Sequence, residues 1–253
     1  MAAVPKRVLE AVAVGAAGAA LGFGTGRLVG ALLGGSEVLG VVLAVPAGLN
    51  GVLSGARGVY AWRTPGGWLA FLLDSSWALI STTLGVAVNL INLVRRDTGF
   101  SPEFSVRTNR HVFGRGFALK RGFANTQGNV ISNACCGRGD EPENHRNLIE
   151  RHEGLHVWQQ RWFGPIHPLV YVVWGVLGAL IATVFGITSR RRKAYGVRIG
   201  KLVETAAYYD NPFEYWAYRN DGRWKVNSAH PALKWGAFAW TKDGAKEPGP
   251  DDS

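Results

Sequence analysis

"RNLIERHEGLHVWQQRWFGP" (residues 146–165) contains two histidines four residues apart. Acids and a proline before this stretch, and Gly164-Pro165 at its end, predict that it forms one helix. On a helix, His152 and His156 project from one face on successive turns, where both imidazoles can bind the same ion. Glu153 is offset around the helix, where its carboxylate can take a proton from water without being a ligand. The alternative is an ordinary amphipathic helix with one solvated and one buried histidine.

The composition favours membrane helices joined to a smaller domain. Glycine accounts for 34 of 253 residues, only 18% of residues are charged, and the apolar residues are concentrated in blocks. The net charge is +10, and cations flank these blocks at Lys6-Arg7, Arg95-Arg96 and 190–193. Such flanking cations are typical of membrane proteins, so nucleic acid is excluded as a partner and the lipid bilayer is expected. The adjacent Cys135 and Cys136 are expected to be free thiols.

Two apolar segments at the N-terminus carry rows of small residues. The first runs from Val8 to about Gly35, and the second from Val38 to Ala56. Glycines recur in the first at strict four-residue spacing, at Gly18, Gly22, Gly26, Gly30 and Gly34. Because glycines let helices approach backbone to backbone in lipid, we expect a close-packed glycine-zipper hairpin. A pore or an oligomer lined by the stripe is the alternative.

A third span is expected from Ser75 to Val94, which contains 20 uncharged residues. Asp74 at its start either marks a proton or ion path or is hydrated at the interface, and the sequence leaves both open. The predicted organisation is therefore about three transmembrane helices in residues 1–96, a small α+β domain in 97–240, and a disordered tail in 241–253.

Short alternating stretches separated by glycines predict a small set of strands between residues 97 and 141. The stretch "GNVISNA" (128–134) is a candidate edge strand, which would bind an extended peptide by strand addition.

The sequence "HEGLHVWQQRWFGP" resembles the zincin metallopeptidases of the glutamate-ligand type, and in particular uncharacterised bacterial proteins with a later Asn-Pro-x-Glu segment. Here that segment is "DNPFEYWAY" (210–218), and the resemblance covers roughly residues 105–220. It implies that His152, His156 and Glu214 are ligands of Zn²⁺ and that Glu153 is the general base.

The residues around Glu214 give separate support. Asn211-Pro212 is a plausible helix start, which places Glu214 in a first turn where the helix dipole favours a carboxylate. An ordinary first-turn acid is the alternative. Four residues are unranked candidates for stabilising an oxyanion: Tyr215, Tyr218, His167 and His230.

The apolar run 169–188 creates a topological conflict. If it crosses the bilayer once, the histidines and Glu214 end on opposite sides. Counting three upstream spans by the positive-inside rule places the N-terminus inside and residues 97–166 outside, and it favours a true span. We expect instead that the run is re-entrant or lies in the membrane, either broken at its glycines or dipping into lipid. Trp158, Trp162 and Trp174 would then be interfacial anchors.

The sequence thus predicts a mainly α integral membrane protein, in a bacterial cell membrane, with glycine-zipper helices and a small zincin-like domain. Its expected function is that of a zinc metallopeptidase, cutting peptide or protein substrates near the membrane surface. The alternative is a non-catalytic structural subunit that assembles as a homo-oligomer or within a larger membrane complex. A channel using the glycine stripe and Asp74 is a third hypothesis.

Overall fold

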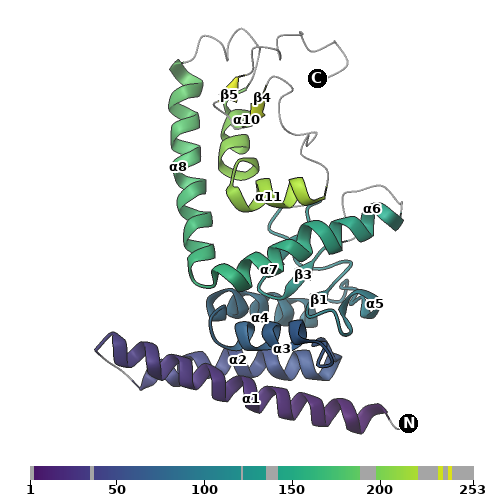
Figure 1. The fold of residues 1–253 in the computed structure, drawn as a ribbon. Helices are drawn as coiled ribbons and strands as arrows, with labels where there is room; N and C mark the ends of the chain where they lie inside the picture. The colour runs from purple at the N-terminus through teal and green to yellow at the C-terminus, as the bar shows by residue number, and fades with distance from the viewer. Residues whose placement is uncertain are drawn as a thin grey trace. The chain divides into compact units, whose positions relative to one another are not determined.

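A computed structural model describes residues 3–34, 37–120, 122–134, 142–188, 198–221, 233–235 and 239–240. The chain is mainly helical and divides into two compact units, Met1–His167 and Pro168–Ser253 (Figure 1). The predicted boundary after residue 96 lies inside the first unit. Cys135, Cys136, His230 and the predicted tail 241–253 lie outside the described residues.

Helices α1 (Ala3–Leu32) and α2 (Val38–Arg57) form a hairpin at the N-terminus (Figure 1). Glycines of α1 face the backbone of α2: a Cβ added at Gly22 would lie 2.5 Å from the Leu43 carbonyl oxygen, and one at Gly18 2.7 Å from that of Ala47. Only glycine permits this approach of the two backbones. The expected close packing is therefore present, and the transmembrane character of these helices remains a prediction.

The predicted third span is not a straight helix. Helix α3 (Pro65–Ser75) and helix α4 (Leu79–Val94) are bent by 91° at residues 76–78. The Thr82 hydroxyl donates to the Asp74 carbonyl oxygen across the bend (2.8 Å), which satisfies a backbone group that the broken helix leaves unpaired. Among the described residues, three helices are long and apolar enough to cross a membrane, in Lys6–Leu32, Val38–Arg57 and Ile166–Thr188.

A three-stranded sheet follows, after the short helix α5 (Pro102–Ser105). Its strands are β1 (His111–Val112), β2 (Asn125–Gln127) and β3 (Val130–Ser132), in the order β1-β3-β2. Strand β3 pairs parallel with β1 and antiparallel with β2. The prediction that 128–134 is an edge strand is therefore wrong, because β1 covers the side of β3 that would have accepted a peptide.

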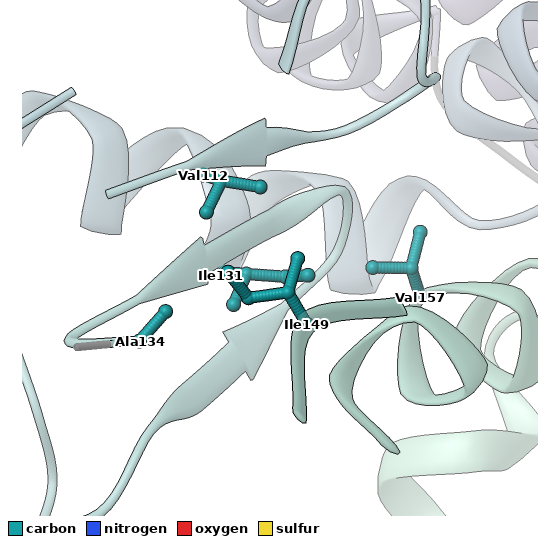
Figure 2. Close-up of a cluster of buried hydrophobic side chains, with 5 residues drawn as sticks. All are labelled: Val112, Ile131, Ala134, Ile149 and Val157. Atoms are coloured by element: carbon teal, nitrogen blue, oxygen red, sulfur yellow. The ribbon is translucent and has the colours of Figure 1, made fainter. Parts of the chain in front are cut away.

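The predicted histidine helix is present as α6 (Pro142–Asn147), a π-helical turn η1 (Leu148–Glu153) and α7 (Gly154–Phe163). It ends at Gly164, as predicted. Figure 2 shows its contact with the sheet, where Ile149 and Val157 meet strand residues in a buried apolar cluster. The members of this cluster are Val112, Ile131, Ala134, Ile149 and Val157. The sheet therefore supports the helix that carries the histidines.

The second unit is built on α8 (Ile166–Thr188), which is one unbroken helix with no reversal at its glycines. The chain returns through α10 (Ile199–Glu204), a π-helical turn η2 (Thr205–Tyr209) and α11 (Pro212–Asn220). The short strands β4 (Leu233–Trp235) and β5 (Ala239–Trp240) follow.

The returning chain runs antiparallel to α8. Gly186 lies against Ile199, and the Trp174 indole donates to the Ala206 carbonyl oxygen (3.0 Å). By residue 214 the chain has come back to Tyr171, near the start of α8. A single crossing by α8 therefore does not by itself leave Glu214 at the far end of α8. Whether α8 crosses the membrane or lies in it stays a prediction.

Candidate metal centre

Three potential ligands predicted from the sequence come together. His152, His156 and Glu214 each offer one ligand atom, and these atoms all lie within 4.8 Å of one another. All three side chains are buried. Two imidazoles and a carboxylate form a donor set that suits a divalent metal ion. This cluster can therefore hold a metal.

The two histidines occupy consecutive turns of one helical segment. Their ring centroids are 5.0 Å apart and their planes are inclined by 78°. The helix changes from π to α geometry between them, and the Gly154 amide donates to the carbonyl oxygen of Ile149, five residues back. Such π turns are frequent at functional sites, and nothing in the sequence pattern indicated this one.

Gln159 determines which nitrogen of His156 carries the proton. The Gln159 Oε1 atom lies 2.8 Å from His156 Nδ1. Because this oxygen can only accept, Nδ1 must donate, and the lone pair is on Nε2. A side chain that fixes the tautomer of a metal-binding histidine in this way usually raises metal affinity.

The predicted general base is held by the sheet. The Thr126 hydroxyl, on β2, donates to Glu153 Oε2 at 2.6 Å. About two turns further along, the Gln160 side chain accepts from the Gly128 amide (2.7 Å). The strand end and the helix are thus joined at two points, one of which orients the Glu153 carboxylate.

The glycine in His-Glu-Gly-Leu-His has a packing role. A Cβ at Gly154 would lie 2.5 Å from Arg110 Nη1. Burial lowers the pKa of Arg110, and the nearby Glu150 carboxylate opposes this effect. The glycine therefore makes room for a half-buried cation beside the helix that carries the two histidines.

Asp74 is buried, so the prediction that it is a hydrated interfacial acid is wrong, whereas a role in a proton or ion path stays a prediction. Asp74 binds Arg161 of α7 through two hydrogen bonds of 2.8 Å. Tyr60 and Asn129 donate to the same carboxylate. The acid therefore fixes α7 to α3, and its partner 87 residues away could not be identified from the sequence.

Glu214 lies in the first turn of α11, as predicted from Asn211-Pro212. The Asn211 side chain caps the helix by accepting from the Phe213 amide (3.0 Å). Tyr171 of α8 donates its hydroxyl to Glu214 Oε1 at 3.0 Å. Sequence reasoning missed Tyr171, although it is a hydroxyl-bearing aromatic residue in an otherwise apolar run.

The proposed oxyanion donors lie in different surroundings. Tyr218 is buried against the Tyr209 ring (5.7 Å between centroids), and Tyr215 accepts a hydrogen bond from Arg219 (3.2 Å). His167 is buried at the start of α8. None of the three belongs to the metal-ligand cluster that the described residues form.

A further buried histidine, His111 on β1, lies outside the candidate metal cluster. Arg57 Nη1 donates to His111 Nδ1 (3.0 Å), so Nε2 carries the proton and faces the Ser54 hydroxyl (3.0 Å). Burial, together with the charges of Arg57 and Arg161, holds the pKa of His111 well below its usual 6.5. His111 is therefore neutral in the folded protein at neutral pH.

Comparison with protein-family models, with characterised proteins and with solved structures finds no match for this chain.

Proposed function

We propose that the protein is a membrane-bound, zinc-dependent metallopeptidase that hydrolyses peptide bonds close to the membrane surface. The observation that supports it best is the approach of His152, His156 and Glu214 to within 4.8 Å. Zinc fits this donor set better than calcium or magnesium, which prefer oxygen ligands alone.

Zinc, when bound, supplies a Lewis acid that makes water acidic and polarises a carbonyl group. The protein side chains have the other roles in the proposed hydrolysis. His156 would hold the metal through Nε2, since Gln159 holds the proton on Nδ1. Glu153 would act as the general base that accepts a proton from water, and Thr126 orients its carboxylate by donating to Oε2. Tyr171 orients the Glu214 carboxylate.

The structure gives less support to the alternative function, a structural subunit. It depends on the glycine stripe as a surface for assembly with other chains. Gly18, Gly22 and Gly26 instead face the backbone of α2 in the same chain. We therefore favour the enzyme over the assembly module. The channel hypothesis used Asp74 as part of an ion path, but Asp74 is paired with Arg161.

The test combines metal content with hydrolysis. Purified wild-type protein is expected to contain one zinc ion per chain by elemental analysis, and His156→Ala is expected to lose it. Glu153→Gln is expected to keep the zinc and to lose cleavage of a fluorogenic peptide library. Absence of stoichiometric zinc from the wild type contradicts the proposal, and so does a Glu153→Gln variant that cleaves as the wild type does.

A further inference from the structure

Both ends of the bent pair α3–α4 meet the same end of the α1–α2 hairpin. Just before α3, the Trp62 indole donates to Glu10 Oε1 (2.8 Å). Late in α4, Asn89 accepts from Arg57 at the end of α2 (2.6 Å). Glu10 and Arg57 belong to one end of the hairpin, because a Cβ at Gly55 would lie 2.6 Å from the Glu10 carbonyl oxygen. The bent pair therefore begins and finishes at the open end of the hairpin.

The bend itself lies partway along the hairpin. The Ser75 hydroxyl, at the end of α3, is 3.6 Å from the Cβ position of Gly18, which packs on Ala47. From Glu10 to Gly18 a helix rises about 12 Å, at 1.5 Å per residue. This depth is less than half of a hydrocarbon core of about 30 Å. The pair therefore turns back well before the hairpin turn at residues 33–37.

The outer surface of the bent pair suits lipid. Between Arg63 and Arg95 the only charged residue is Asp74, which is buried against Arg161. The exposed large side chains of α3, α4 and the bend between them are apolar or aromatic, and they include Trp68, Leu72, Trp77, Ile80, Leu84 and Leu90. Such a continuous apolar face is unfavourable in water, and exposed arginines at both of its ends suit phosphate headgroups.

The bend also contacts the end of the histidine helix. The Trp77 indole donates to the Trp162 carbonyl oxygen (3.1 Å), and a side chain at Gly164 would clash with the Trp77 ring. Trp162 is 56% exposed. Tryptophan is enriched where membranes meet water, so these two residues extend the apolar face to the end of α7.

Three of the four cations on α1 and α2 lie at the open end of the hairpin, and Arg27 is the exception. Lys6, Arg7 and Arg57 lie there on α1 and α2, and Arg63, Arg95 and Arg96 flank the bent pair. The turn between α1 and α2, "LGGSE" (33–37), contains no lysine or arginine, and its Glu37 pairs with Arg27. The positive-inside rule places the cation-rich end in the cytoplasm.

We propose that α3 and α4 form a re-entrant elbow in the lipid, and that residues 97–167, with both histidines, lie on the cytoplasmic side together with the N-terminus. Counting three spans placed residues 97–166 outside. A re-entrant elbow enters and leaves the membrane on the same side, so the proposal places these residues inside instead. It concerns sidedness and goes beyond the proposed function.

The test uses single cysteines and a maleimide that does not cross membranes. Cys135 and Cys136 are replaced by serine, and Arg63→Cys, Arg96→Cys and Leu33→Cys are introduced one at a time at exposed positions. In bacterial cells, Arg63→Cys and Arg96→Cys are expected to label only in inverted membrane vesicles. Leu33→Cys, in the hairpin turn, is expected to label only in intact cells. Repeating the labelling with His156→Ala separates this test from the zinc proposal, because sidedness does not depend on the metal.

Labelling of Arg63→Cys and Arg96→Cys from opposite sides would show that the bent pair is a span. Labelling of both in intact cells would place the domain outside, and labelling of all three from one side would show that the hairpin does not cross. Each result overturns the proposal. A fluorescent label on Leu84→Cys tests the lipid contact: we expect quenching by spin-labelled lipid and not by iodide. Quenching by iodide would contradict lipid contact at this position. Quenching by neither agent would also contradict it, because a second protein copy would then cover the label.

Discussion

Arg161 binds Asp74 through two parallel hydrogen bonds, from Nε to Oδ1 and from Nη2 to Oδ2, each 2.8 Å long. The arginine lies on α7, five residues after His156, and the aspartate lies on α3. Their side chains are only 2% and 1% exposed. The pair therefore fixes the helix that carries the histidines to the N-terminal helices, which explains why one compact unit includes both.

Replacing Asp74 by asparagine leaves the Arg161 charge buried without its counterion. We expect Asp74→Asn to lower the free energy of unfolding by about 3–5 kcal/mol. Chemical denaturation of the purified protein in detergent measures this change. Asp97→Asn is the matched control, because Asp97 pairs with Arg95 on the surface (2.8 Å) and its loss should have no measurable effect.

A variant that lacks both charges of the buried pair tests whether the unpaired charge causes the loss of stability. The double variant Asp74→Leu, Arg161→Leu should recover much of the stability lost in Asp74→Asn, since no unpaired charge remains. Equal stability of Asp74→Asn and Asp97→Asn would show that the buried pair does not hold α7 in place.

Two neighbouring glutamines on α7 have different partners and should have different effects. Gln159 contacts His156, whereas Gln160 contacts the Gly128 amide. We expect Gln159→Ala to weaken zinc binding by about 10–100-fold, because the tautomer of His156 is no longer fixed. Gln160→Ala should lower stability and leave the zinc affinity close to that of the wild type. Competition with a chelating dye measures the affinities, and the reverse order would contradict this assignment.

His111 should make stability fall in acid. Its pKa is depressed in the folded state, so the unfolded chain binds an extra proton once the pH falls below about 6.5. Its contribution to stability is therefore complete above pH 6.5 and is lost as the pH falls towards the lower, folded pKa, at up to about 1.4 kcal/mol per pH unit. Unfolding curves between pH 7.5 and pH 5 should show a steeper loss in the wild type than in His111→Asn. Identical pH dependence would contradict the neutral, buried state of His111.

Two glycines of α1 provide a matched test of the hairpin. A Cβ at Gly22 would lie 2.5 Å from the Leu43 carbonyl oxygen, whereas one at Gly24 would meet no atom within 4 Å. Gly22→Ala should lower stability by about 1–3 kcal/mol, because the helices must separate. Gly24→Ala should be neutral or stabilising by up to about 1 kcal/mol, since alanine favours the helix. Thermal unfolding in detergent compares them, and equal effects would argue against backbone contact at Gly22.

Local signals predicted the elements that carry the three candidate metal ligands. The acidic start and Gly164-Pro165 gave the histidine helix, and Asn211-Pro212 gave the start of α11 with Glu214 in its first turn. Glycine spacing predicted the close approach of α1 and α2. Each of these features is encoded within a few residues, which is why a single sequence reveals it.

Features that depend on distant partners were not predictable. The bend at residues 76–78 contains neither glycine nor proline, and α4 turns there because its polar residues bond to the sheet and to α2, as Asn92 does to Ser132 (3.0 Å). The edge position of β2 follows from the parallel pairing of β1 with β3, across 19 residues of sequence. Thr126 can donate its hydroxyl to Glu153 only because β2 lies at this edge of the sheet.

The central claim is that Glu214 joins the two histidines around one zinc ion, and the zinc dissociation constant of Glu214→Ala tests it most directly. The matched control is Glu204→Ala, because Glu204 lies in the same unit and pairs with Lys201 (3.2 Å) instead. We predict that Glu214→Ala binds zinc more weakly than the wild type by over about 100-fold, more than the loss of an outer-shell partner causes, and that Glu204→Ala binds normally. Wild-type affinity in Glu214→Ala would contradict the claim.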